Sequence, residues 1–348
     1  MKILHSADLH LDSPFAGLTR EQAAELRRAQ LALPGRLAAL CRAEGCDLVL
    51  LAGDLFDGAW TKESLNALRF ALEEMAVPVF ISPGNHDFCG VDSPYLTEEW
   101  PENVHIFTRS SLESVALPAL DCRIYGAGYR SMDCDPLLEG FQAEGSERYH
   151  IAVLHGDAVR TGSTYCSITS EQVRRSGLQY LALGHIHKTG SFRSGKTLCA
   201  WPGCPMGRGY DEPDSRGVMI VTVEDQAEVR FIELDTPRFY DLSCSPLELD
   251  ALLPPVGNDH FYRITLTGEA ETPDLKALSA EFSRFPNLEL RDRTVPPADL
   301  WGCADADSLE GVYFRMLRDA LANGDEEIVT LAARISRQIL DGQEVVLP

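Results

Sequence analysis

Basic side chains are scarce in this chain, and long apolar runs are missing. Its 348 residues include 53 acidic and 31 basic ones, which gives a formal net charge of −22. Because nucleic acid prefers a basic surface, this balance argues against tight DNA binding by the chain alone. No apolar run approaches the roughly 18 to 20 residues that cross a bilayer, and the first residues do not form a secretory signal. We therefore expect a cytoplasmic protein with no membrane association.

Closely spaced cysteine pairs are also missing. The ten cysteines form no C-x-x-C motif, and they lie in or beside apolar segments. Such a distribution favours reduced, buried thiols over a disulfide framework. This interpretation agrees with the expected cytoplasmic location.

The length predicts two domains, at roughly 150 residues per domain. Residues 1–240 alternate apolar strands with helices, and the pattern predicts helices over about 19–43, interrupted at Pro34, and over about 62–75. Shorter strands are predicted within 104–125 and 191–235. Two sheets flanked by helices favour an α/β fold, namely a four-layer α/β/β/α sandwich.

The last 108 residues differ in charge and in pattern. Residues 241–348 carry 20 acidic and 9 basic side chains, against 33 and 22 in residues 1–240, so the same net charge of −11 lies on fewer than half as many residues. A strand, a helix and a strand are predicted at 261–267, 273–284 and 288–293, followed by amphipathic helices after Ser308 and over 326–340. We expect a small α+β cap that ends in these helices.

Five short polar motifs each follow an apolar run that is predicted to be a strand. The runs are 2–6, 46–51, 77–82, 150–154 and 180–183, and the motifs are Asp8-Leu-His10, Gly53-Asp54, Gly84-Asn85-His86-Asp87, His155-Gly-Asp157 and Gly184-His185-Ile-His187. Open α/β sheets place their sites at the carboxyl ends of successive strands. Carboxylates, imidazoles and an amide that meet there form the inventory of a two-metal phosphoesterase centre, in which two ions share a bridging carboxylate.

Each motif alone has an ordinary alternative. Asp8 and His10 point the same way from an extended strand end, yet a surface Asp-x-His loop is the commoner case. Gly53-Asp54 is a frequent turn. In the third motif Asn85 offers a neutral oxygen and His86 a proton donor. It is the ordered set of five that predicts the centre, and its carboxylate and imidazole donors suit Mn, Fe or Zn better than Mg alone.

The series resembles the calcineurin-like metallophosphoesterases, and more narrowly the SbcD- and YhaO-like DNA repair exonucleases of bacteria, relatives of the Mre-type double-strand-break nuclease. The resemblance is carried by Met1–Asp12, Gly53–Asp57, Gly84–Asp87, Leu183–Lys188 and Trp201–Arg208. It covers residues 1–240 and fades beyond them. It therefore implies a metallophosphoesterase (nuclease) domain at 1–240 and an acidic cap or accessory region at 241–348.

The resemblance also implies a role for each motif. One ion would be held by Asp8, His10, Asp54 and His187, and Asp54 would bridge to a second ion held by Asn85, His155 and His185. His86 would protonate the leaving oxygen after metal-bound hydroxide attacks the phosphodiester in line. Some relatives carry histidine at the position of Asp57. The auxiliary role of a second histidine over the phosphate is therefore in doubt here. Arg208 is expected near the site, either as a phosphate contact or in a structural salt bridge.

The function expected on this basis is that of a Mn(II)-dependent DNA exonuclease in repair or end processing. The resemblance implies an SMC-like ATPase of the SbcC/YhaN type as partner and a homodimer of the nuclease. The ATPase would contribute basic surface for DNA, and residues 309–340 either bind it or complete the fold. Two alternatives stay open: a metallophosphoesterase of small phosphoesters or nucleotides, and a non-catalytic scaffold, against which the intact ligand set argues.

Overall fold

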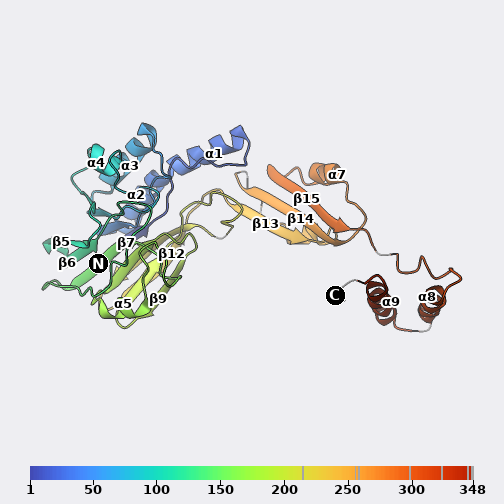
Figure 1. Cartoon of the computed structure of the whole chain (residues 1–348). Helices are drawn as coiled ribbons and strands as arrows, with labels where there is room; N and C mark the ends of the chain where they lie inside the picture. Colours follow the sequence, from blue (N-terminus) through green and yellow to red (C-terminus); the bar gives the residue numbers. More distant parts are fainter. Residues whose placement is uncertain are drawn as a thin grey trace. The chain divides into compact units, whose positions relative to one another are not determined.

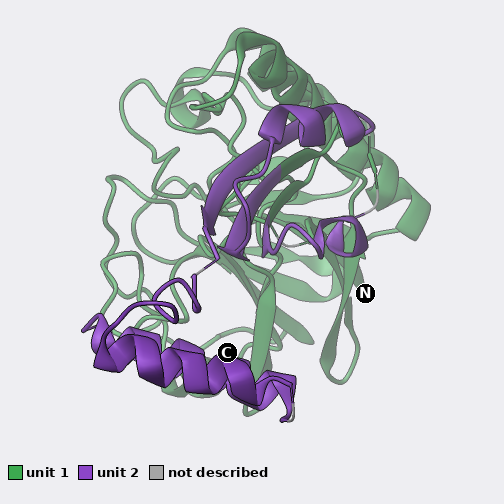
Figure 2. Cartoon of the chain, turned by 90° about the vertical axis from the view of Figure 1, so that its right-hand side faces the viewer, with its two compact units in different colours: residues 1–241, 256–262, 285–287 green, residues 242–255, 263–284, 288–348 purple. Residues whose placement is uncertain are grey.

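Two compact units make up the chain (Figure 2). The computed structural model describes residues 1–213, 215–254, 256–257, 259–297, 299–322, 324–342 and 345. The first unit comprises 1–241, 256–262 and 285–287, and the second comprises 242–255, 263–284 and 288–348. All five motifs lie in the first unit. Within the described ranges, no helix combines the length and the apolar character needed to cross a bilayer.

The first of two six-stranded sheets in this unit carries three of the motifs (Figure 1). Its order is β12-β11-β1-β2-β3-β4. The strands are β1 (Lys2–Ser6), β2 (Leu48–Leu51), β3 (Val79–Ile81), β4 (Val104–Ile106), β11 (Gly217–Val223) and β12 (Ala227–Glu233). β1 to β4 run parallel, whereas β11 and β12 are antiparallel to their neighbours. The carboxyl ends of β1, β2 and β3 therefore share one edge of the sheet.

The second sheet carries the other two motifs. Its order is β5-β6-β7-β8-β10-β9. The strands are β5 (Glu113–Leu117), β6 (Cys122–Gly126), β7 (Tyr149–His155), β8 (Tyr180–Gly184), β9 (Gly190–Ser194) and β10 (Thr197–Trp201). β6, β7, β8 and β10 are parallel, and β5 and β9 are antiparallel edge strands. The sequence pattern does not predict β9, because its Gly-Ser-Phe-Arg-Ser composition is that of a loop and only pairing with β10 makes it a strand.

Alternate side chains of the buried strands enter two different cores. In β2, Leu48 and Leu50 pack in a cluster with Ile151 and Tyr180 of the second sheet. Val49, on the opposite face, packs in a cluster with side chains of the helices. The two sheets thus lie face to face with helices outside, which confirms the predicted four-layer α/β/β/α sandwich. All ten cysteines are free, and eight of them are buried, as predicted.

The main helices of this unit cover the outer face of the first sheet. They are α1 (Arg20–Leu31), α2 (Leu33–Glu44) and α3 (Lys62–Met75), and short helices follow as α4 (Pro94–Thr97), η1 (Pro118–Leu120) and α5 (Ser170–Arg175). The predicted interruption at Pro34 separates α1 from α2, because proline fits the first turn of a helix. Gly45 ends α2 in the left-handed conformation. β2 begins shortly after the end of α2 and pairs in parallel with β1.

The second unit contains most of a three-stranded sheet, of order β13-β14-β15, and, among its described residues, four helices. Its elements are β13 (Phe239–Cys244), α6 (Leu249–Leu252), β14 (Phe261–Glu269), α7 (Leu275–Glu281), β15 (Asn287–Val295), α8 (Leu309–Ala320) and α9 (Glu326–Leu340). The sequence pattern does not predict β13. α8 and α9 pack through Phe314 and Ala333, while Leu309, Met316 and Ile328 are exposed. That this region caps the site or docks a partner stays a prediction.

Candidate metal centre

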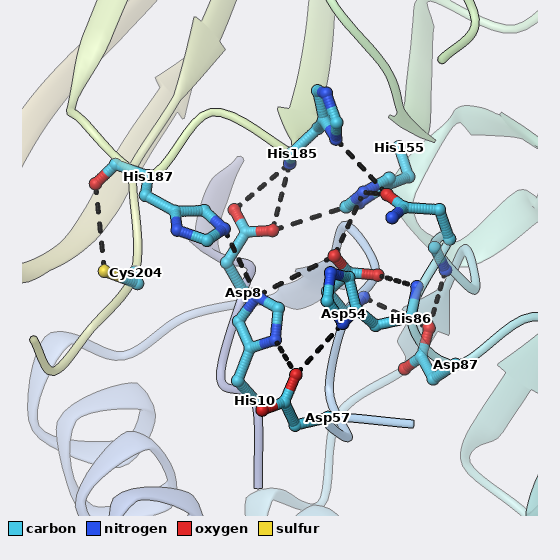
Figure 3. A network of polar contacts seen from close by, with 12 residues as sticks. Asp8, His10, Asp54, Asp57, His86, Asp87, His155, His185, His187 and Cys204 are labelled. Carbon is cyan, nitrogen blue, oxygen red and sulfur yellow. Dashed lines mark hydrogen bonds and ion pairs between the residues drawn. The ribbon is translucent and has the colours of Figure 1, made fainter. Parts of the chain in front are cut away.

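The five motifs lie at the carboxyl ends of β1, β2, β3, β7 and β8 (Figure 3). The backbone of the ligand candidates there is unusual for residues other than glycine. Its φ is 53° at Asp8, 51° at Asp54 and 91° at His185. Such left-handed backbone is costly, and it gathers at functional sites where the surrounding structure enforces it. Four of the nine described non-glycine residues with positive φ are predicted ligands, namely Asp8, His10, Asp54 and His185.

Asp54 lies at the centre of the site. Its Oδ2 is 3.4 Å from Nε2 of His155 and 3.7 Å from Nε2 of His10, and its Oδ1 accepts a hydrogen bond from the backbone N–H of His86 at 2.8 Å. Gly84 makes this approach possible, because a Cβ there would collide with the Asp54 carboxylate. The buried carboxylate therefore faces two groups of candidate ligands, as a bridging ligand must.

The first group consists of Asp8, His10 and His187, whose donor atoms lie within 4.8 Å of one another. The Nε2 atoms of His10 and His187 are 3.2 Å apart. Nδ1 of His10 lies 3.2 Å from Asp57 Oδ1, and Nδ1 of His187 lies 2.6 Å from Glu212 Oε1. When both imidazoles are neutral and each Nδ1–H donates to its carboxylate, the two Nε2 atoms direct lone pairs at each other. Two acceptors this close repel unless they share a cation, so the pair fits a metal ion.

Asn85, His155 and His185 form the second group. Asn85 Oδ1 lies 2.9 Å from Nε2 of His155 and 3.3 Å from Nδ1 of His185. Nδ1–H of His155 donates to the Ala52 carbonyl at 2.9 Å, which leaves Nε2 to bind a cation. The backbone N–H of His185 donates to the Asp8 carboxylate at 3.0 Å and ties the two groups together. All seven predicted ligands therefore lie in one connected network, of which Figure 3 labels every member except Asn85.

The carboxylates of the site attract positive charge. Burial acts to lower the pKa of His155, but Asp54 and Asp8 outweigh it and raise that pKa to about 9. Burial conversely acts to raise the pKa of Asp54, yet His155 and His10 hold it well below its usual range. In the metal-free protein a proton on His155 therefore supplies the positive charge that a metal ion would supply. This donor set of carboxylates, imidazoles and an amide fits divalent first-row metal ions.

Mn(II) is expected to stabilise the protein more strongly as the pH rises. The raised pKa of His155, about 9 against a usual 6.5, gives the metal-free protein stability that is complete below pH 6.5 and is lost as the pH rises through 9. Metal binding requires the neutral imidazole and competes with that proton. Differential scanning fluorimetry with saturating Mn(II) should show a larger increase in melting temperature at about pH 8.5 than at about pH 6. Equal increases would contradict this explanation.

His86 lies at the edge of the site, with 41% of its side chain exposed. Its Nδ1 is 3.0 Å from Asp57 Oδ1, and this hydrogen bond raises the pKa of His86. Because Nδ1 is engaged, Nε2 is the atom that can give a proton to a substrate. The same Asp57 oxygen also lies 3.2 Å from Nδ1 of His10. Asp57 thus positions a candidate ligand and the candidate acid together.

Glu212 lies behind His187 and is not predicted by any motif. It is buried, and its Oε1 accepts a hydrogen bond from Nδ1 of His187 at 2.6 Å. Burial acts to raise the pKa of Glu212, but His187 and Arg208 bring it well below the usual value. An ionised carboxylate here fixes the imidazole with Nε2 directed at the site, as outer carboxylates do for histidine ligands of metals.

Arg208 bridges the two carboxylates at this edge. Its guanidinium lies 3.2 Å from Glu212 Oε1 and 3.7 Å from Asp57 Oδ1. Arg208 therefore forms a salt bridge, which is one of the two roles that the sequence allowed. The other role, contact with a phosphate, stays a prediction. Arg208 and Glu212 lie between β10 and β11, and the resemblance over Trp201–Arg208 was the sequence signal for this part of the site.

Replacement of Glu212 by glutamine is expected to weaken Mn(II) binding about ten-fold or more. The neutral amide no longer holds the His187 imidazole by charge, and the Arg208 guanidinium loses its buried partner. Calorimetric titration of the metal-free protein with Mn(II) measures the effect. Glu228→Gln, a change of an exposed glutamate in β12, is the matched control. Unchanged affinity in Glu212→Gln would show that Glu212 has no role in holding the ligand.

Asp87 fixes the loop that carries Asp54. Its Oδ2 accepts hydrogen bonds from the Leu55 N–H and from the Tyr95 hydroxyl, both at 2.6 Å. Its Oδ1 accepts from the backbone N–H groups of Gly84 at 2.7 Å and of Asp54 at 3.2 Å. A buried carboxylate that accepts several such bonds holds two loops in one arrangement. The last residue of the third motif is therefore structural.

This fold and site define a class of protein. The family model for calcineurin-like phosphoesterases matches residues 1–189, more than half of the chain. The chain therefore belongs to the calcineurin-like phosphoesterases, a family of hydrolases that use a dimetal site. The candidate ligand groups described above agree with that membership.

Proteins of known name and solved structures are similar to the chain, among them the following three. The metallophosphoesterase YhaO of Bacillus subtilis is 33% identical over 243 residues, which is 64% of this chain and 57% of YhaO. SbcD, a component of the nuclease SbcCD from the same bacterium, is 25% identical over 283 residues, 67% of this chain and 69% of SbcD. A dimetal phosphatase of Danio rerio aligns over 67% of this chain and 96% of its own at 14% identity, with a TM-score of 0.45. The matched segment thus spans less than two thirds of YhaO.

Proposed function

We propose that this chain is a Mn(II)-dependent phosphodiesterase that acts as a DNA exonuclease in repair or end processing. The observation that carries the proposal is the pair of facing Nε2 atoms of His10 and His187, 3.2 Å apart beside the buried Asp54. The half-exposed His86 lies next to them, where an acid can reach a leaving oxygen. Similarity to SbcD, a component of the nuclease SbcCD, supports a nucleic acid as the substrate, and similarity to YhaO supports a metallophosphoesterase.

Each side chain has a defined task in this proposal. One ion would be held by Asp8, His10, Asp54 and His187, and a second by Asn85, His155 and His185 together with Asp54. Bound there, the ions would supply a water molecule of lowered pKa and stabilise the negative charge that develops on the phosphate. His86, held at Nδ1 by Asp57, gives the proton on Nε2 to the leaving oxygen. Arg208, fixed by Asp57 and Glu212, adds positive charge at the edge of the site.

Manganese is the ion that we propose for the cell. The donor set includes four imidazoles besides carboxylate and amide oxygens, whereas Mg(II) prefers oxygen ligands alone. Metal-free protein reloaded in turn with Mn(II), Fe(II), Zn(II) and Mg(II) tests this choice through kcat. We expect the highest kcat with Mn(II), and a highest kcat with Fe(II), Zn(II) or Mg(II) would overturn the choice.

The assay of the proposed function compares three substrates. Linear double-stranded DNA, single-stranded DNA and bis-p-nitrophenyl phosphate are incubated with the Mn(II)-loaded protein. We expect hydrolysis of the small ester and shortening of DNA from an end. Hydrolysis of the small ester with both DNA substrates intact would favour the alternative, a metallophosphoesterase of small phosphoesters or nucleotides. The net charge of −22 is the observation that favours this alternative.

We propose that a partner compensates for the acidic charge of the chain. The proposed partner is an SMC-like ATPase of the SbcC/YhaN type, and the nuclease itself acts as a homodimer in the cytoplasm. Exposed apolar side chains on α8 and α9, among them Leu309, Met316 and Ile328, offer a surface for such a partner. DNA affinity is measured for the chain with and without the ATPase at several salt concentrations. Tight binding by the isolated chain, with a steep dependence on salt, would contradict the need for a partner.

A further inference from the structure

A cavity of about 710 Å³ lies beside the candidate acid His86. Its walls come from residues 56 and 58–60, after β2, and from residues 86–88 and 90–94, after β3, together with Met132. Ligand pockets in proteins commonly measure about 300 to 1,000 Å³. The cavity belongs to the first unit, and it is formed by the same two loops that supply Asp54 and Asn85 to the centre.

Aromatic side chains line this cavity. Phe56 is fully buried, whereas Trp60 and Phe88 are half-buried. The indole N–H of Trp60 donates to the carbonyl oxygen of Asp92 at 3.4 Å, so the side chain links the two loops. A ring held in this way loses little further freedom when a flat ligand stacks on it.

The lining offers little positive charge to an anionic occupant, because His86 is the one basic side chain among the described residues that form it. Among the lining residues, all of which the structure describes, none is lysine or arginine. Of the two acidic ones, Asp87 is engaged with backbone N–H groups and the Tyr95 hydroxyl, and Asp92 is exposed. The guanidinium of Arg208 instead lies at the other carboxylates of the site, Asp57 and Glu212. An uncharged, planar group fits this lining better than a phosphate.

The position of His86 determines which part of a substrate reaches the cavity. The His86 ring lies 4.8 Å from the His10 ring, hence beside the candidate ligands, and it also lines the cavity. An acid gives its proton to the oxygen that leaves. With the phosphate at the ligands and the leaving oxygen at His86, the group attached to that oxygen is directed to the cavity.

We propose that this cavity binds the nucleobase of the nucleotide that carries the leaving oxygen, with the base stacked on Trp60. The inference rests on the proposed DNA phosphodiesterase function and assigns a subsite of the same centre. A base that enters must leave its stack with neighbouring bases, and contact with the indole face offsets that cost. Since every base has a π face, the subsite accepts any sequence.

A double-mutant cycle, in which modified substrates are combined with protein variants, tests the subsite. The substrates are short single-stranded oligonucleotides, either intact or with one abasic residue on the leaving side of the scissile phosphate, on its other side, or two positions away. The position of the phosphate on the products identifies the leaving side. The variants are Trp60→Ala and Trp60→Phe, and the control is Phe70→Ala, a change of an exposed phenylalanine on α3. The kcat and KM values are measured with Mn(II), and melting temperatures report folding.

The abasic residue on the leaving side and Trp60→Ala should each lower kcat/KM about ten-fold, and the two together should lower it no further than either alone. Trp60→Phe should recover most of the loss, and Phe70→Ala should match the unchanged protein. Additive losses, or coupling to the base on the other side, would overturn the subsite but leave DNA cleavage in place. If the unchanged protein hydrolyses bis-p-nitrophenyl phosphate but cuts no oligonucleotide, the proposed function itself is wrong.

Discussion

Replacement of Asp54 by asparagine is expected to remove most phosphodiesterase activity without unfolding the protein. The Asp54 carboxylate is buried, and its Oδ2 faces His155 at 3.4 Å and His10 at 3.7 Å, so its negative charge acts on both groups of candidate ligands. Asparagine has nearly the same shape but no charge. We expect kcat for bis-p-nitrophenyl phosphate to fall about a thousand-fold or more, which corresponds to roughly 4 kcal/mol of lost transition-state stabilisation.

The metal content of the same variant shows how the activity is lost. Asp54→Asn should retain fewer Mn(II) ions per chain than the unchanged protein, measured by mass spectrometry after gel filtration. Asp225→Asn is the matched control, because Asp225 is fully exposed between β11 and β12. Its activity and metal content should equal those of the unchanged protein. Full activity and full metal content in Asp54→Asn would show that Asp54 is not a shared ligand.

Replacement of His86 by alanine is expected to slow DNA cleavage about a hundred- to ten-thousand-fold, the range usual for loss of a general acid. The proton on Nε2 is needed when the leaving group is a sugar alkoxide. The p-nitrophenolate ion leaves readily without a proton, so hydrolysis of bis-p-nitrophenyl phosphate should fall much less. Kinetics of both substrates with saturating Mn(II) measure this difference.

The competing role for His86 is that of a metal ligand. His86 lies in one group with His10 and Asp54, whose donor atoms are within 4.8 Å of one another. If His86 were a ligand, the alanine variant would lose metal, and both substrates would suffer equally. His105→Ala, a change of an exposed histidine in β4, is the control and should leave both rates unchanged. Equal losses for both substrates would therefore contradict the role of acid.

Much of the fold was predictable because local signals agree with tertiary packing. The apolar run 2–6 coincides with β1, and the amphipathic segment 62–75 coincides with α3. The motif residues were predicted to meet because parallel strands end at one edge, and the structure brings all seven candidate ligands into one network. The role of each ligand in holding a metal stays a prediction for the variants above.

The remaining features depend on contacts between distant segments. Glu212 reaches His187 through a loop whose sequence resembles no regular element, so no local pattern marks it as part of the site. The positioning role of Asp57 depends on His86 and His10, which lie 29 and 47 positions away in the sequence. The φ of Gly84 is not positive, and the need for glycine at this position comes instead from the close Asp54 carboxylate. These relations exist only once the sheets have assembled.

Anomalous diffraction from crystals soaked in Mn(II), recorded at the manganese absorption edge, tests the central claim most directly. We expect two anomalous difference peaks that flank Asp54. One lies against His10 and His187, and the other lies against Asn85, His155 and His185. A single peak, or peaks away from Asp54, would contradict a two-metal centre built from the ends of these five strands.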